Sequence, residues 1–282
     1  MIKLNFIKMH GCGNDYIYFD CFEQTIRDVK FLAQSLCHRN KGIGGDGIVL
    51  ISPSTIADAK MNMYNKDGSE ATMCGNAIRC VAKYVYESGI VKDTKMTIET
   101  LSGVKMLYLY VDEEKDVVTH VKVDMGLPIF TPHRIPVLLE GDSIISRPIT
   151  LGNITYKITC VSMGNPHCVI FGHKLDELLL PFVGPLFEKH KMFPEGVNIE
   201  FVEIVGKNHL KIRVWEKGNG ETLACGTGAC AAAVAAILNG YCDKNEDVRV
   251  TLLGGQLTIR YADNTVYMLG ECVKTFEGTV EV

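Results

Sequence analysis

Two stretches of this chain carry the same residues at the same spacing, and this repeat constrains the fold more than any other feature. Asn14 and Cys74 lie 60 residues apart (74 − 14), and Asn165 and Cys225 also lie 60 apart (225 − 165). A single offset of 151 therefore relates the two pairs, and the register between them holds without a gap. A duplicated unit predicts two structurally similar halves, with any functional site built from equivalent positions of both.

The local pattern around each cysteine agrees with the repeat. Segments 60–64 and 211–215 alternate as half-buried strands, and each leads into a glycine-bearing turn that ends at a cysteine. Apolar residues at helical spacing follow the first cysteine, and the small-residue run 229–238 follows the second. We therefore expect Cys74 and Cys225 each to stand directly before a helix.

Strands outnumber helices in the rest of the pattern, which favours a mixed α/β (α+β) fold. The boundary between halves is expected near 125–135, where Gly126 and three prolines cluster, giving domains at 1–126 and 127–271 related by a pseudo-twofold axis. The final strand, around 272–282, can return to the first domain. Further strands are predicted at 95–100, 104–111, 117–124, 154–161, 197–204, 247–252 and 255–261.

Composition narrows the class of partner. The chain has 282 residues, 47% of them hydrophobic, which is enough for two cores. Its net charge of −4 and scattered basic residues argue against nucleic acid and favour a small-molecule partner. No stretch approaches the roughly 18 apolar residues of a membrane span, and the N-terminus lacks a signal peptide, so we expect a cytoplasmic protein without membrane contact.

The eleven cysteines are read as reduced thiols, because their odd number and the missing signal peptide argue against a disulfide framework. No Cys-x-x-Cys occurs, and the closest pairs, Cys74 with Cys80 and Cys225 with Cys230, do not fit zinc spacing, so no metal is expected. Most of the other cysteines are interpreted as small buried hydrophobes. Cys74 and Cys225 are different, because the repeat makes them equivalent.

Two equivalent thiols suit the inversion of a carbon centre. Such a reaction needs a base on one face and an acid on the other, with the roles exchanged for the reverse direction. Cysteine has a reference pKa of about 8.5, and a helix N-terminus can lower it, so thiolate and thiol can coexist near neutral pH. Backbone N–H groups at the two helix starts can hold the substrate carboxylate; they belong to Gly75, Asn76, Gly226 and Thr227. This scheme needs no cofactor.

Several motifs taken together resemble diaminopimelate epimerase nearly from end to end. The asparagines among them, and His167, could otherwise be turn and packing residues. The motifs are Met-His-Gly-Cys-Gly-Asn-Asp-Tyr at 9–16, Gly-Ile-Gly-Gly-Asp-Gly at 42–47, Asn-Lys-Asp-Gly-Ser-Glu at 65–70, Cys-Gly-Asn-Ala-Ile-Arg-Cys at 74–80, Ser-Met-Gly-Asn-Pro-His at 162–167, Val-Asn at 197–198 and Ala-Cys-Gly-Thr-Gly-Ala-Cys at 224–230.

The resemblance implies a pyridoxal-independent epimerase that interconverts LL- and meso-diaminopimelate for lysine and peptidoglycan precursors, usually as a homodimer. It implies mostly antiparallel strands wrapped around a central helix in each half. Cys74 and Cys225 match the family's catalytic cysteines, and the backbone at 75–76 and 226–227 matches its carboxylate cradle. The substrate-binding asparagines correspond to Asn14, Asn65, Asn165 and Asn198. His167 and Glu216 correspond to the residues expected to modulate the thiol pKa values, and Glu216 is also expected to bind substrate.

One departure bears on the substrate. The family commonly has Glu-Arg-Gly where this chain has Glu216-Lys217-Gly218, and that arginine helps to hold the far carboxylate of diaminopimelate. Lys217 is therefore expected in the substrate site, but it keeps the charge without the planar, bidentate fork of arginine. Substrate affinity or the preferred substrate can change as a result.

Other functions remain open on the sequence. A racemase of another amino acid, such as histidine or lysine, would keep both cysteines. A phenazine-type isomerase is disfavoured by the presence of both thiols, and a proline racemase by asparagines that fit an acyclic diamino acid. A non-catalytic amino-acid-binding or thiol redox module is the alternative outside the enzymes, and it could not catalyse exchange of an α-hydrogen.

Overall fold

The computed structural model describes residues 2–172 and 174–282 and divides into two compact units. The first unit comprises Met1–Val123 with Leu269–Val282, and the second comprises Asp124–Met268. The sequence prediction placed the change of domain three residues further along the chain in both cases, at 126/127 and 271/272. That the two units are separate folding domains stays a prediction.

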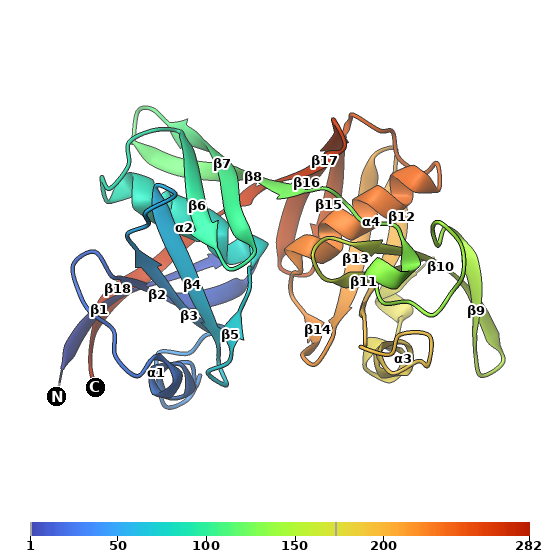
Figure 1. The fold of residues 1–282 in the computed structure, drawn as a ribbon, viewed down its shortest axis with the longest axis horizontal. Helices are drawn as coiled ribbons and strands as arrows, with labels where there is room; N and C mark the ends of the chain where they lie inside the picture. Colours follow the sequence, from blue (N-terminus) through green and yellow to red (C-terminus); the bar gives the residue numbers. More distant parts are fainter. Residues whose placement is uncertain (1, 173) are drawn as a thin grey trace. The chain divides into compact units, whose positions relative to one another are not determined.

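The described residues of the first unit form the α-helices α1 and α2 among their strands, which can be followed in Figure 1. Its elements are β1 (Lys3–Gly11), β2 (Asn14–Asp20), α1 (Val29–Leu36), β3 (Gly47–Ser52), β4 (Ala59–Asn65), β5 (Glu70–Ala71), α2 (Gly75–Glu87), β6 (Lys95–Thr100), β7 (Gly103–Asp112), most of β8 (Val117–Gly126) and β18 (Val273–Glu281).

The second unit repeats this order. Its elements are the 3-10 helix η1 (Pro132–Arg134), β9 (Arg147–Leu151), β10 (Ile154–Ser162), β11 (Pro166–Phe171), η2 (Leu175–Glu177), α3 (Leu180–Glu188), β12 (Asn198–Gly206), β13 (His209–Glu216), β14 (Gly220–Thr222), α4 (Gly226–Leu238), β15 (Asp247–Leu252), β16 (Gly255–Ala262) and most of β17 (Thr265–Glu271).

The offset of 151 found in the sequence also relates these elements. It moves the bounds of α2, 75–87, onto those of α4, 226–238. Strand pairing repeats as well. In the first unit β2 and β3 are parallel, and β3 and β4 are antiparallel. In the second unit β11 and β12 are likewise parallel, and β12 and β13 are antiparallel. The duplication therefore extends from residue identities to the hydrogen-bonded framework.

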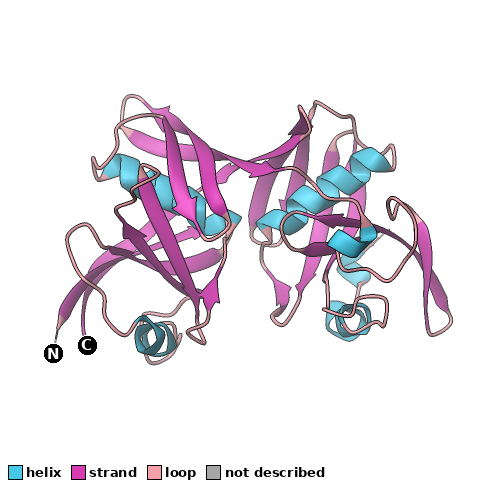
Figure 2. Ribbon diagram, viewed as in Figure 1, coloured by secondary structure: helices cyan, strands magenta, loops and turns pink. Residues whose placement is uncertain are grey.

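Each unit is built around one buried helix, α2 in the first unit and α4 in the second. Figure 2 shows these helices in cyan among the magenta strands. Helix α2 contacts β1, β2, β4, β6 and β7, and α4 contacts β10, β11, β12, β13, β15 and β16. Residues 229–236 of α4 are buried on every face, because alanine, cysteine and valine side chains are small enough for strands to approach all round. The predicted α+β class is confirmed.

The last strand of the chain belongs to the first unit. β18 pairs antiparallel with β1, with Leu4 opposite Val280. In the second unit the corresponding partner of β10 is β9, which precedes it in the sequence. None of the described helices is long and apolar enough to span a membrane.

Candidate functional site

The first half-site is centred on Cys74, which is the N-cap residue of α2. Its backbone is extended, with φ −134° and ψ 121°, so the chain enters the helix directly after the cysteine. The side chain is half-buried, and Sγ lies 3.2 Å from Oδ1 of Asn14. An amide oxygen only accepts hydrogen bonds, so the Cys74 thiol is the donor.

Asp46 fixes the orientation of Asn14. Nδ2 of Asn14 donates to Oδ2 of Asp46 at 2.8 Å, and Oδ1 of Asn14 accepts a second bond from Nδ2 of Asn76 at 3.3 Å. Because a carboxylate only accepts, the amide nitrogen must face Asp46 and the amide oxygen must face Cys74. Arg39 in turn holds Asp46, at 2.9 Å.

An ionic network supports this arrangement from behind. Arg39 also bonds Asp15 at 2.6 Å, and Lys8, which is 6% exposed, pairs with the same carboxylate. Burial by itself would raise the pKa of Asp15, but the hydrogen bonds from Arg39 and Lys8 lower it overall. Asp15 therefore stays ionised and keeps both cations in place.

The start of α2 is held by a buried arginine. Arg79 is 0% exposed and donates to the carbonyl of Gly75 and to Oδ1 of Asn76, both at 3.0 Å. Asn76 is thereby oriented with its Nδ2 toward Asn14. Asn65, at the end of β4, is only half-buried and donates from Nδ2 to Oγ of Ser69 within its own turn.

The second half-site is centred on Cys225, the N-cap residue of α4, which has the same extended backbone, φ −118° and ψ 112°. Here the sulfur is an acceptor: the N–H of Gly228 lies 3.3 Å from Sγ, and Oγ1 of Thr227 lies 3.4 Å from it. The side chain is buried, with 7% exposed.

At Cys225 the helix start does not lower the thiol pKa overall. Its pKa is raised well above the ordinary value, first by burial and then by the negative charges of Glu216 and Glu200. The hydrogen bond with Thr227 and the one from the N–H of Gly228 act in the opposite direction and do not outweigh the loss of hydration. Cys225 is accordingly a thiol near neutral pH.

Behind Cys225 lies a buried polar chain. Oε1 of Glu200 is 2.7 Å from Nδ1 of His167, and both side chains are 0% exposed. Nε2 of His167 is 3.0 Å from Oδ1 of Asn165, which is half-buried. Gly228 makes room for Glu200, since a Cβ there would lie 2.6 Å from Oε1.

Asn198, at the start of β12, is bonded at both ends of its amide. Nδ2 donates to the carbonyl of Pro166 at 2.9 Å, and Oδ1 accepts from the N–H of Lys217 at 2.9 Å. Asn198 thus fixes the backbone at Lys217, whose own side chain is exposed. Glu216 accepts from the hydroxyl of Thr222 at 2.5 Å.

The structure groups the sequence-predicted residues into these two half-sites. The first holds Asn14, Cys74 and Asn76 in direct contact, with Asn65 in a separate turn. The second holds Cys225 with Thr227, Asn165 with His167, and Asn198 with Lys217. Sequence reasoning missed the residues that support the two half-sites, among them Asp46, Arg79 and Glu200. Asp46 and Arg79 lie within quoted motifs, whereas nothing in the sequence marks Glu200 apart from its place in a buried strand.

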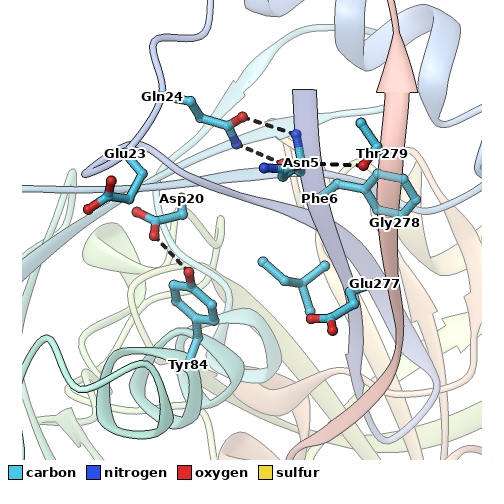
Figure 3. A pocket seen from close by; sticks show the side chains of 10 residues that line it. Asn5, Phe6, Asp20, Glu23, Gln24, Tyr84, Glu277, Gly278 and Thr279 are labelled. Atoms are coloured by element: carbon cyan, nitrogen blue, oxygen red, sulfur yellow. Dashed lines mark hydrogen bonds between the residues drawn. The ribbon is translucent and has the colours of Figure 1, made fainter. Parts of the chain in front are cut away.

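A pocket in the first unit lies apart from these residues (Figure 3). Three carboxylates line it, those of Asp20, Glu23 and Glu277, and the hydroxyl of Tyr84 donates to Asp20 at 2.7 Å. A substrate that presents carboxylates would be repelled there. No group of His, Cys, Asp or Glu in residues 2–172 and 174–282 is arranged to hold a metal ion.

Solved structures with the same fold include a phenazine biosynthesis protein of the PhzF family from Bacillus anthracis, with a TM-score of 0.72 and 16% identity over 100% of both chains. A probable proline racemase from Agrobacterium radiobacter gives a TM-score of 0.73 and 15% identity, covering 99% of this chain and 92% of that one. At these identities the likeness establishes the fold alone.

Closer relatives define the class. Curated proteins named diaminopimelate epimerase, from Acetivibrio thermocellus and from Methanococcus maripaludis, are each 50% identical over 281 residues, with 99% of this chain and 99% and 100% of theirs covered. With two equivalent cysteine half-sites on this fold, the protein is an isomerase. The family model described as diaminopimelate epimerase matches residues 6–131 and 159–275. The chain therefore belongs to the diaminopimelate epimerase family.

Proposed function

We propose that this protein epimerises LL-2,6-diaminopimelate to meso-diaminopimelate without pyridoxal phosphate, in lysine and peptidoglycan precursor biosynthesis. The observation that carries the proposal is the equivalence of Cys74 and Cys225. Both are N-cap residues of buried helices related by the offset of 151, in a chain that belongs to this family. The substrate is an amino acid whose α-carbon both thiols must reach, one from each face.

In the proposed reaction, one cysteine first releases its proton to solvent. The resulting thiolate removes the α-hydrogen as a proton, so that its sulfur becomes a thiol again. The electron pair of the broken C–H bond is delocalised into the adjacent carboxylate. The other cysteine, as thiol, delivers its proton to the opposite face and becomes the thiolate. One proton is taken up and one is released, so no oxidant, reductant or cofactor is consumed.

The carboxylate gains negative charge in this step, and helix starts can stabilise it. The backbone N–H groups of Gly75 and Asn76 and those of Gly226 and Thr227 lie in the first turns of α2 and α4. Backbone N–H groups that point out of a first helical turn, together with the helix dipole, favour an anion. Such preorganised donors lower the barrier because the charge they meet is larger in the transition state than in the ground state.

Lys217 is proposed to bind the far carboxylate of diaminopimelate. Its side chain is exposed, and Nζ makes no hydrogen bond or ion pair within the described part of the chain. The backbone N–H of Lys217 donates to Oδ1 of Asn198, and this contact with another proposed substrate-binding residue supports the proposal. Because lysine offers a point charge in place of a fork, a racemase of another amino acid remains the second candidate.

The test is α-hydrogen exchange in deuterated water with the reduced protein and no added pyridoxal phosphate. LL-diaminopimelate, L-histidine and L-lysine are incubated separately, α-proton loss is followed by NMR, and stereochemistry by chiral chromatography. Exchange with inversion of diaminopimelate alone is expected. Inversion of histidine or lysine instead would move the substrate assignment, and no exchange with any of them would overturn the catalytic proposal.

A homodimer and a cytoplasmic location complete the proposal. The family resemblance supports the homodimer, and sedimentation velocity is expected to give a mass twice that of the chain. All eleven cysteines are free thiols in the structure, which fits a reducing compartment such as the cytoplasm. A monomer under assay conditions would contradict the first part without affecting the chemistry.

A further inference from the structure

Glu200 is a buried carboxyl group that the two-thiol reaction does not use. It lies on β12, and its only hydrogen-bond partner among the side chains of residues 2–172 and 174–282 is His167. Its second oxygen, Oε2, is buried without a partner in the same residues. Burying a carboxyl oxygen with no hydrogen bond is costly, so its presence at this position calls for a role.

The chain of contacts from Glu200 ends at an unused donor. Nε2 of His167 lies 3.0 Å from Oδ1 of Asn165, and an amide oxygen only accepts, so Nε2 must carry a hydrogen. Asn165 is half-buried, and its Nδ2 makes no hydrogen bond within the described part of the chain. The buried carboxyl is therefore connected through one imidazole to an amide NH₂ group that is free to donate to a ligand.

We propose that Glu200 is a positioning residue for substrate binding. Glu200 shares one proton with Nδ1 of His167. This leaves a second proton on Nε2 of His167, which donates to Oδ1 of Asn165. The Nδ2 hydrogens of Asn165 are then presented to a carboxylate of the amino-acid substrate. The inference rests on the proposed function, which supplies that carboxylate.

The proton count explains why the carboxyl is needed. With two hydrogens the pair is neutral overall, as carboxylate with imidazolium or as carboxylic acid with imidazole. If instead His167 carried a hydrogen on Nδ1 alone, Nε2 would accept from Asn165 and the amide oxygen would turn outward. An outward oxygen would repel a carboxylate, so the second proton decides what Asn165 offers.

The surroundings of Glu200 favour the neutral pair. Burial raises the pKa of Glu200, and His167 opposes this only in part. The ionisable groups that face it are Cys168 and Cys225, whose own pKa values are raised well above the ordinary range, first by burial. Both thiols are protonated at pH 7, so within the described residues no charge other than that of His167 is shown next to Glu200.

The direct test is ¹⁵N NMR of the histidine ring, which reports tautomer and does not depend on activity. Uniformly ¹⁵N-labelled protein is recorded between pH 6 and pH 9, and His167 is assigned by the loss of its signals in His167→Gln. A protonated Nε2 in the wild type is expected over this range. An unprotonated Nε2 would overturn the proposal, even in a fully active enzyme.

Two substitutions test the consequence for binding. In Glu200→Gln the new amide can donate to Nδ1 and leave the hydrogen on Nε2, so KM for diaminopimelate is expected to stay within about threefold of wild type. Glu200→Met leaves Nδ1 without a partner, and KM is expected to rise about tenfold to a hundredfold, with a smaller change in kcat. The matched control is Glu203→Gln on the same strand, where the carboxylate accepts no hydrogen bond from residues 2–172 and 174–282.

The outcomes separate this proposal from the proposed function. An unchanged KM in a folded Glu200→Met protein, or a tenfold rise in Glu203→Gln, would overturn the positioning role. If Glu200→Met does not fold, the Glu200→Gln kinetics and the NMR tautomer still decide. A wild-type protein that epimerises nothing but keeps Nε2 protonated would refute the function and leave the Glu200–His167 proton arrangement standing.

Discussion

Cys74 and Cys225 stand at equivalent positions and yet make opposite hydrogen bonds. Cys74 is half-buried and donates to an amide oxygen 3.2 Å away, whereas Cys225 is buried and accepts from a backbone N–H at 3.3 Å. The backbone at both is extended and enters a thirteen-residue helix. The duplicated frame thus fixes where the two sulfurs stand, and the neighbouring side chains decide how each is bonded.

The neighbours differ in a concerted way. At positions related by the offset of 151, the second unit has a buried polar chain where the first unit has a tyrosine and two apolar residues. His167 stands where the first unit has Tyr16 (16 + 151), Glu200 where it has Val49 (49 + 151), and Gly228 where it has Ala77 (77 + 151). Because Gly228 leaves the space that Oε1 of Glu200 occupies, the last two differences belong together.

The largest expected effect is the loss of either site thiol. Cys74→Ala and Cys225→Ala each remove one of the two proton carriers, so epimerisation of diaminopimelate is expected to fall by at least about a thousandfold in kcat. Activity is measured by chiral chromatography of the product. Cys242→Ala, outside both half-sites, is the control and should keep most of the activity. A fully active Cys74→Ala protein would refute the two-thiol mechanism.

The next prediction concerns the reactivity of Cys225 and its dependence on pH. Its raised pKa means that it is protonated at pH 7 to 8, and the thiolate, which is the nucleophile, forms only as the pH rises well above the ordinary value of about 8.5. In Cys74→Ala protein, alkylation of Cys225 by iodoacetamide at pH 8 should be at least about tenfold slower than that of free cysteine.

Glu216 sharpens this prediction, because its negative charge is the second cause of the raised pKa. Glu216→Gln should lower the pKa of Cys225 and increase alkylation at any pH between 7 and 9, whereas Glu246→Gln, an exposed carboxylate, should change nothing. Peptide mapping by mass spectrometry separates Cys225 from the other thiols. A rate equal to that of free cysteine at pH 8 would show that burial does not control this group.

The sequence revealed the parts of the molecule that depend on local pattern and on the repeat. Strands such as β6 and β15 were predicted at their observed bounds, because apolar and polar residues alternate between turn residues. The two helices after the cysteines were also predicted. By contrast, the sequence did not predict β2, β3 and β11, because these strands are buried on both faces and carry no alternation. It did not predict α1 and α3 either, because both helices are short.

The half-sites were less accessible to sequence reasoning than the fold. The cysteines and asparagines could be named from spacing and resemblance, but their hydrogen-bond roles depend on residues far along the chain, such as Asp46, which lies 32 positions from Asn14. The raised pKa of Cys225 could not be read from its place before a helix, because burial outweighs the helix start there. Glu200 was missed for the same reason: its importance arises only from what surrounds it.

A third prediction tests whether Asp46 makes Cys74 a donor. In Asp46→Asn the new amide can donate to Asn14, so Asn14 is expected to turn over and present its NH₂ group to the sulfur. An N–H donor stabilises the thiolate, so the pKa of Cys74 should fall, and kcat/KM should drop about tenfold. The pKa is measured from the pH dependence of alkylation in a Cys225→Ala background.

The control for Asp46 is Asp116→Asn, which removes another carboxylate of the same unit that pairs with Lys92 at 2.8 Å. It should leave both the alkylation profile and kcat/KM unchanged, because this exposed pair contributes little and touches neither half-site. If Asp46→Asn behaves like the control, the amide of Asn14 is oriented by something other than Asp46. Asp46 would then not explain why Cys74 donates a hydrogen bond where Cys225 accepts one.

The smallest effect is expected in stability, from exchanging the packing of one half for that of the other. Gly228→Ala would place a methyl group 2.6 Å from Oε1 of Glu200 and 3.3 Å from Sγ of Cys225, and should lower the free energy of unfolding by about 1–3 kcal/mol.

Glu200→Val with Gly228→Ala recreates the Val49–Ala77 pair of the first unit. The two changes should therefore couple favourably, by about 0.5–3 kcal/mol in a double-mutant cycle from urea unfolding. Gly206→Ala, where an added Cβ meets nothing within 4 Å, is the control and should cost less than about 0.5 kcal/mol. Strict additivity of the two substitutions would mean that Glu200 and Gly228 are not in contact, and the polar chain behind Cys225 would then need a different packing explanation.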